Sequence, residues 1–176
     1  MFDNYFQLWH KEITKNVDIR HFGSSLTTDL QCLGALRKMI KSQHIGKRMT
    51  EKKVIETSAA PGAVGPYSQA IQANNLLFTS GQLPIDPATG TIPEGAISLR
   101  AHQALKNLAA VIKAAGAGLE DVVKVSLFLA DIKDFQEVNT VYAEYFQTPC
   151  PARSAYQVAA LPLGADIEIE AVVFIP

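Results

Sequence analysis

The segment Thr148-Pro-Cys-Pro-Ala-Arg-Ser contains the side chain with the clearest chemistry in the sequence. Arg153 is the only arginine between Ala101 and the C-terminus, and it follows a stretch that two prolines stiffen. A guanidinium can grip a carboxylate through two parallel hydrogen bonds. Arg153 could therefore bind an anionic substrate. The alternatives are a structural ion pair with Glu168 or Glu170, or plain exposure to solvent.

Two carboxylates close to the C-terminus offer a second group. Glu168 and Glu170 alternate with isoleucines, so they lie on one face of a predicted strand. They could be a solvated face. In the functional interpretation, one carboxylate positions a water molecule while Arg153 holds an anionic substrate nearby.

Small polar residues occur beside two further predicted strands, in Gly65-Pro-Tyr-Ser and Thr79-Ser-Gly-Gln. Tyr67 and Ser80 could place a phenol and a hydroxyl beside the same site, and Gly81 permits close backbone approach. The alternative is that each hydroxyl makes one ordinary structural hydrogen bond.

Other kinds of site find little support. No glycine-rich turn opens a helix after a strand, so no nucleotide site is predicted. His102 is the only histidine after Met49, and no metal site is predicted. We expect His102 to be a surface residue of a helix. Cys150 lacks an obvious histidine partner, so a free thiol is favoured over a nucleophile, and Cys32 is expected to be free as well.

The elements that must position these residues have distinct patterns. The predicted order is strand, strand, strand, helix, strand, helix, strand, strand, over residues 53–57, 69–73, 76–80, 96–115, 121–130, 134–146, 154–159 and 167–175. Asp134 and Glu137 have the spacing of a capping box at the start of the second helix. This order predicts an α+β fold in which both helices cover one face of a sheet.

The last predicted strand ends in Val-Val-Phe-Ile, which is apolar on both faces. A strand of this kind needs cover on both sides of its sheet. If the helices cover one side, another subunit can cover the other, so we expect a homo-oligomer.

Charge divides the chain near Met49. Residues 1–48 have a net charge of +4 and no proline, whereas residues 49–176 have a net charge of −5 and all nine prolines. We expect residues 1–48 to lie outside the main fold. They could be a non-native leader, a flexible basic arm or an organelle-targeting presequence, although four acidic residues argue against the last.

The remaining composition predicts a globular, cytoplasmic protein. Hydrophobic residues make up 48% of the 176, and no apolar run approaches the ~18 residues of a membrane span, so no membrane partner is expected. The acidic main part argues against nucleic-acid binding.

Four segments together resemble the RidA (YjgF) family of reactive enamine/imine intermediate deaminases. These segments are Gly65-Pro-Tyr-Ser-Gln-Ala, Phe78-Thr-Ser-Gly-Gln, Asp134-Phe with Val138-Asn and Tyr142, and Pro151-Ala-Arg-Ser followed by Ile167-Glu-Ile-Glu-Ala. The resemblance covers residues 50–176 in one register. It implies a fold like that of trimeric chorismate mutase, with sites in clefts between the subunits of a homotrimer.

The resemblance also implies an activity and roles for single residues. The activity is cofactor-free hydrolysis of 2-aminoacrylate and related imines, small-molecule carboxylates, to 2-oxo acids and ammonia. Arg153 would bind the substrate carboxylate and Glu168 would position the attacking water. The pocket would be lined by Tyr67, Ser80, Gly81 and Asn139. Some members have a cysteine where this chain has Ala155, which leaves the substrate range open.

Two other functions are compatible with the same resemblance. One is a non-enzymatic protein that binds small carboxylates, against which Arg153 argues. The other is a ribonuclease or translation inhibitor, which the acidic main part disfavours and the basic residues 1–48 keep open.

Overall fold

The computed structural model describes residues 52–176. The predictions made for residues 1–48 lie outside the described part of the chain. Within it, the predicted order of strands and helices is confirmed. The strands are β1 (Lys52–Ile55), β2 (Ala70–Ala73), β3 (Leu76–Thr79), β4 (Val122–Leu129), β5 (Ala152–Gln157) and β6 (Ile167–Phe174). The helices are α3 (Ile97–Ala114) and α4 (Phe135–Tyr145), with short 3-10 helices η2 (Leu119–Asp121), η3 (Ile132–Asp134) and η4 (Pro162–Gly164).

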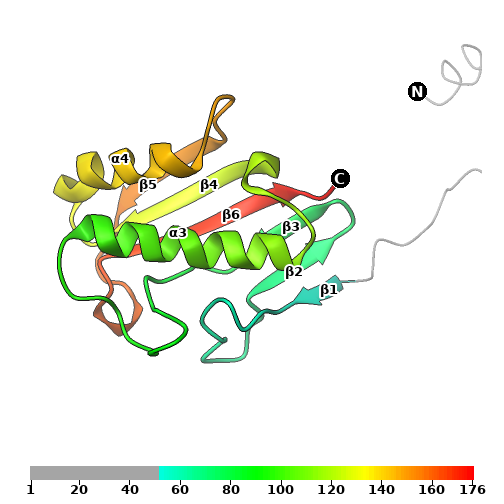
Figure 1. Cartoon of the computed structure of the whole chain (residues 1–176), viewed down its shortest axis with the longest axis horizontal. Helices are drawn as coiled ribbons and strands as arrows, with labels where there is room; N and C mark the ends of the chain where they lie inside the picture. The colour runs from blue at the N-terminus through cyan, green and yellow to red at the C-terminus, as the bar shows by residue number, and fades with distance from the viewer. Residues whose placement is uncertain (1–51) are drawn as a thin grey trace, which may run out of the picture. The chain divides into compact units, whose positions relative to one another are not determined.

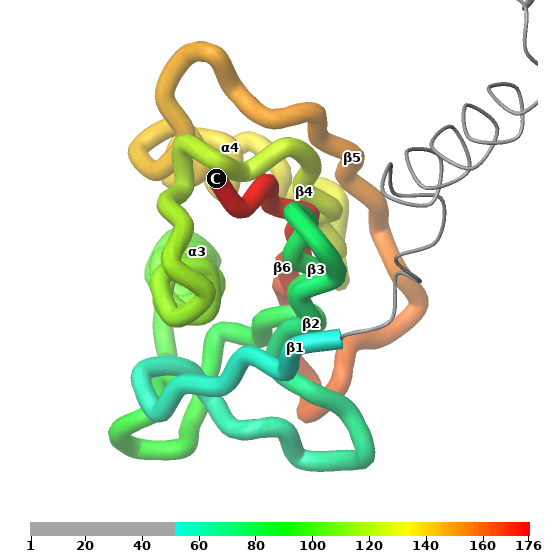
Figure 2. Tube along the Cα trace, turned by 90° about the vertical axis from the view of Figure 1, so that its right-hand side faces the viewer, coloured from blue at the N-terminus to red at the C-terminus, as the bar shows by residue number. Residues whose placement is uncertain are grey.

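The six strands form one mixed sheet in the order β1-β2-β3-β6-β4-β5. Only β4 and β5 run parallel. Both helices lie against the same face of this sheet (Figure 1), and Figure 2, which views the sheet from one end, shows α3 on one side of it. The predicted α+β fold with two helices on one face is therefore confirmed.

The hairpin of β2 and β3 forms as the sequence predicts. Its turn is made by Asn74 and Asn75, and Asn74 has a φ of 55°. Asparagine tolerates this left-handed conformation better than most residues. The hairpin continues into β6 through antiparallel pairing of β3, which brings the segment after β3 beside Glu168.

Helix α3 buries a stripe that differs from the predicted one at its start. Ile97, Ala101, Leu105 and Leu108 are buried, whereas Leu99, which was assigned to the apolar face, is 53% exposed. The buried residues recur at three- and four-residue intervals from Ile97, and this spacing places Leu99 outside the stripe.

The predicted capping box of α4 is wrong. Asp134 has helical backbone angles because η3 leads directly into α4, and its side chain caps nothing. Asp131 caps η3 instead, through a hydrogen bond from the Lys133 backbone N–H. The Glu137 carboxylate accepts a hydrogen bond from the Ser98 N–H at 3.1 Å, so it links α4 to the start of α3.

The two faces of the sheet have different surroundings. On the face toward the helices, Leu77, Leu127 and Ile169 are completely buried. The opposite face, which we call the open face, contains side chains that alternate with these core residues. Large apolar members of the open face include Phe78 and Phe174, which are 46% and 47% exposed. The last strand therefore presents apolar side chains on both faces, as the sequence indicates.

Candidate active site

A cleft of about 820 Å³ lies beside the edge of the sheet where β3 ends and β6 begins. Four predicted site residues line it: Tyr67, Ser80, Gly81 and Glu168. Glu170 lines it as well. The structure thus brings together residues that the sequence separates by about a hundred positions.

Backbone pairing places Gly81 against Glu168. The N–H of Gln82 donates to the carbonyl of Ile169 at 2.8 Å, and the N–H of Ile169 donates to the carbonyl of Gln82 at 3.1 Å. The space that a Cβ atom of residue 81 would occupy is filled by the Glu168 side chain, whose Cγ lies 2.8 Å from that position. A glycine is therefore required here for Glu168 to keep its conformation.

The hydroxyl groups of the two predicted residues, Ser80 and Tyr67, make different hydrogen bonds. Ser80 donates to the Ser68 carbonyl at 2.6 Å, so its oxygen keeps acceptor capacity toward the cleft. The Tyr67 hydroxyl accepts a hydrogen bond from the Val64 N–H at 3.3 Å, and the side chain is 48% exposed. Its own proton is free to be donated to a bound molecule.

Gln69, which the sequence did not single out, holds one wall of the cleft. It is 4% exposed. Its side-chain oxygen accepts from the Thr57 N–H at 2.7 Å, and its nitrogen donates to the carbonyls of Thr57 at 3.0 Å and Pro61 at 2.7 Å. The nitrogen also lies 3.3 Å from the Ala60 carbonyl, so a buried amide with four backbone partners fixes the loop that precedes Tyr67.

The Glu168 carboxyl is easier to protonate than an ordinary glutamate. Burial raises its pKa first, and the nearby negative charge of Glu170 raises it further. Both effects disfavour the charged form. A carboxylate of this kind is a better proton acceptor than a solvated one, as a general base requires.

Arg153 and Asn139 do not line this cleft, and they contact each other outside it. The Arg153 Nη2 donates to the Asn139 Oδ1 at 2.8 Å. The guanidinium carbon lies over the rings of Tyr142 at 4.4 Å and Phe135 at 5.3 Å. Within residues 52–176, Arg153 forms no ion pair, so the structural pairing with Glu168 considered from the sequence does not occur.

Arg153 and Glu168 point to opposite faces of the sheet. Arg153 pairs with Val125, a core residue beneath the helices, and directly paired residues share a face. Glu168 pairs with Phe128, whose neighbours Leu127 and Leu129 are core residues, so it lies on the open face. Within one copy of the chain, the two side chains therefore leave the sheet in opposite directions.

The start of β5 explains the position of Arg153. The strand begins at Ala152, two residues earlier than predicted, because parallel pairing with Lys124 begins there. Ala155 is on the same face as Arg153, two residues further along, and packs against the core. Because residue 155 is an alanine, no thiol lies beside Arg153 at this position.

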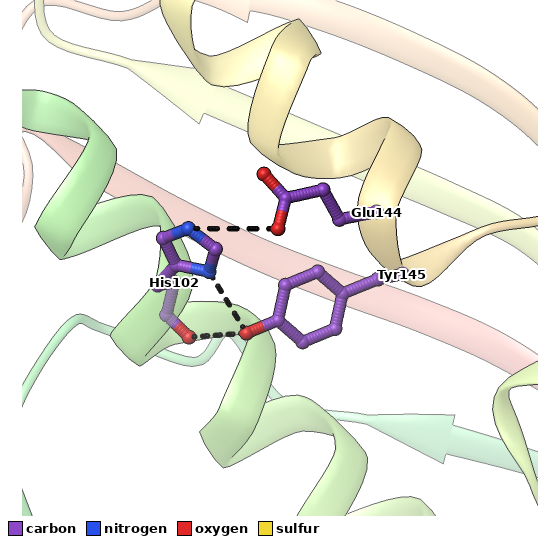
Figure 3. Close-up of polar contacts among 3 residues, drawn as sticks. All are labelled: His102, Glu144 and Tyr145. Carbon is purple, nitrogen blue, oxygen red and sulfur yellow. Dashed lines mark hydrogen bonds and ion pairs between the residues drawn. The ribbon is translucent and has the colours of Figure 1, made fainter.

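His102 and Cys150 take no part in the cleft. Figure 3 shows His102 of α3 beside Tyr145 and Glu144 of α4. The His102 Nδ1 lies 3.1 Å from the Tyr145 hydroxyl, and its Nε2 lies 4.0 Å from a Glu144 oxygen. His102 is thus partly buried between the two helices, whereas the sequence predicts a surface residue. The Cys150 thiol is exposed and free.

Two kinds of feature are absent from the described part of the chain. Between residues 52 and 176, no three His, Cys, Asp or Glu side chains are grouped as metal ligands would be. None of the helices described has the length and apolar character to cross a bilayer.

The chain matches a known family in sequence and in fold. The family model described as endoribonuclease L-PSP matches residues 57–175. The chain belongs to this family, which is also called RidA (YjgF). The family resemblance noted from the sequence is thereby confirmed.

Individual relatives make the comparison more specific. The 2-iminobutanoate/2-iminopropanoate deaminase of Homo sapiens is 51% identical over 121 residues, which cover 69% of this chain and 88% of the relative. The crystal structure of RidA from the Antarctic bacterium Psychrobacter sp. PAMC 21119 superimposes with a TM-score of 0.68 at 45% identity, covering 70% of this chain and 99% of that one. The E. coli TdcF structure with bound serine has a TM-score of 0.68 at 42% identity, covering 71% and 100%.

Proposed function

We propose that this protein is a hydrolytic deaminase of reactive 2-aminoacrylate-type enamines and imines. The overall reaction adds water to the C=N bond of a 2-imino acid and releases a 2-oxo acid and ammonia. The observation that supports it most strongly is the state of the Glu168 carboxyl. This group is half-buried and has a raised pKa, and its side chain occupies space that is available only because residue 81 is a glycine. Relatives at about half identity have the matching deaminase name.

Hydrolysis of an imine mainly requires that the protein orient the reacting groups. The carbon of an iminium group is already electrophilic, so catalysis needs a positioned water and one proton shuttle. Arg153 binds the substrate carboxylate through the donors that Asn139 does not use. Glu168 takes a proton from the water as the water oxygen adds to the iminium carbon, and then returns this proton to the nitrogen of the resulting carbinolamine. The C–N bond breaks to release ammonia, and the hydroxyl group loses its proton to the solvent as it becomes the 2-oxo group.

The site is assembled from two copies of the chain. Arg153 of one copy and Glu168 of another meet in a cleft between subunits of a homotrimer. The support for this is that the two side chains leave opposite faces of the same sheet, and that the open face has half-exposed apolar residues such as Phe78 and Phe174. An apolar sheet face of this kind is typical of a subunit interface.

The proposal is tested by an assay that generates imines in situ from several amino acids and follows 2-oxo acid release. Wild-type protein is expected to accelerate release with no added cofactor, and Arg153→Ala is expected to abolish the acceleration while the oligomer survives in gel filtration. Undiminished release by Arg153→Ala would contradict the assignment of Arg153.

The family description names a second candidate, an endoribonuclease. RNA binding requires clustered basic side chains. The excess positive charge of this chain lies in residues 1–48. An RNA-cleavage assay on the full chain and on a chain starting at Met49 tests this candidate. Cleavage by the full chain alone would support it and assign it to the basic residues.

A further inference from the structure

A stripe of three side chains runs along the face of α4 that Arg153 contacts. Phe135, Asn139 and Tyr142 are spaced four and three residues apart, which places them one above another on the same side of a helix. Each contacts the guanidinium of Arg153, through two rings and one amide oxygen. The stripe is therefore a cradle for this one side chain.

Tyr142 supplies the closest part of the cradle. Its ring centroid lies 4.4 Å from the guanidinium carbon, within the ~6 Å range of cation–π attraction, which strengthens as the groups lose water. Tyr142 is 5% exposed and Arg153 is half-buried. The ring of Phe146 lies 4.4 Å from that of Tyr142, so the tyrosine ring is itself held in place.

The ring of Tyr142, rather than its hydroxyl, makes this contact. The hydroxyl oxygen is buried and has no hydrogen-bond partner among residues 52–176. A buried phenol without a partner does not stabilise the fold through that group. The role we assign to Tyr142 therefore belongs to its aromatic face.

We propose that Tyr142 is a positioning residue, whose ring holds the Arg153 guanidinium in the orientation that receives the substrate carboxylate. This inference rests on the proposed function for the identity of the ligand. Asn139 accepts from one Nη2 proton, and the two rings restrain the plane of the group. The remaining N–H groups have no acceptor among the described side chains and are free to bind two carboxylate oxygens.

The effect should appear mainly in binding. The substrate carboxylate does not react, so Arg153 binds it about equally in the ground state and the transition state, and weakening it raises KM more than it lowers kcat. An arginine that lacks its cradle must lose rotamer freedom when the ligand binds. We expect Tyr142→Leu to raise KM about 10-fold and to change kcat by less than about 3-fold.

Three variants separate positioning from a structural effect. Tyr142→Leu removes the ring, and Tyr142→Phe keeps it and should recover most of the lost affinity. Tyr145→Leu removes a tyrosine from the same helix that contacts His102 instead. It should leave KM unchanged. Phe135→Leu removes the more distant ring, at 5.3 Å, and should raise KM about 3-fold. It keeps the proposal testable if Tyr142→Leu does not fold.

A binding measurement does not depend on catalysis. The dissociation constants of 2-oxobutanoate and of its uncharged amide are measured by calorimetry on the oligomeric protein. Tyr142→Leu should weaken 2-oxobutanoate binding about 10-fold and leave amide binding unchanged. Equal weakening of both ligands, or failure of Tyr142→Phe to recover affinity, would overturn the inference.

The two proposals fail in different ways. If the wild type binds 2-oxobutanoate through Arg153 but hydrolyses no imine, the proposed function is wrong while the role of Tyr142 stands. If the wild type hydrolyses imines and Tyr142→Leu has wild-type KM and binding, the proposed function stands and the role of Tyr142 is wrong.

Discussion

Replacement of Gly81 by alanine tests how Glu168 is held. The new Cβ would overlap the Glu168 Oε1 and would lie 2.5 Å from the carboxyl carbon, whereas ordinary contact begins at 3.4 Å, so the carboxyl must withdraw by at least about 0.9 Å. A displacement of ~1 Å in a catalytic group can cost about 100-fold in rate. We therefore expect Gly81→Ala to lower kcat for imine hydrolysis about 100-fold.

The same change should cost little stability. The displaced atoms are the end of a flexible side chain, and Gly81 has no left-handed backbone conformation that a Cβ would strain. The midpoint of thermal unfolding should therefore remain close to that of the wild type. Gly62→Ala is the matched control, because Gly62 lines the same cleft and a Cβ there meets no atom within 4 Å.

The assay is steady-state release of 2-oxo acid by the three proteins, with gel filtration to confirm the oligomer. Wild-type kcat in Gly81→Ala would refute the claim that the position of the Glu168 carboxyl controls the chemical step. An equal fall in Gly62→Ala would show that any added volume in the cleft lowers activity, and would refute the specific role of Gly81.

Two further predictions concern the pH profile and the fold around the cleft. Glu170→Gln removes the smaller of the two causes that raise the Glu168 pKa, so the acid side of the activity profile should move to lower pH, and an unmoved profile would count against Glu168 as the titrating base. Asn107 is 1% exposed and donates to the carbonyls of Leu83 and Ile85 at 2.9 and 2.8 Å. Asn107→Ala should therefore lower the free energy of unfolding by about 2–3 kcal/mol in urea titrations, and an unchanged midpoint would contradict this.

The sequence predicted the elements well because their patterns are local. The hairpin needed only an Asn-Asn turn between two extended runs, and α3 needed only its apolar period and Gly116 after its end. The errors occurred where tertiary contacts overrule a local rule. Glu137 has the spacing of a capping box, but the Ser98 N–H of the other helix binds its carboxylate instead.

The arrangement of the site could be predicted only in part. The resemblance to the family identified the polar residues of the site. The face of the sheet to which each side chain points depends on strand pairing. The register of β5 on β4 places Arg153 on the face toward the helices. The register of β6 on β4 places Glu168 on the opposite face. The role of Tyr142 had a signal in the sequence, its spacing from Phe135 and Asn139, but that signal is equally typical of an ordinary apolar helix face.

The central claim is that one active site takes Arg153 from one copy of the chain and Glu168 from another. Its most direct test mixes Arg153→Ala and Glu168→Gln proteins, each inactive alone, in equal amounts after unfolding, and refolds them together. Random assembly should restore roughly one quarter of wild-type activity, because half of the copies have an intact arginine, half have an intact glutamate, and the two must meet at one interface. If the mixture remains as inactive as its two components, the shared site is contradicted.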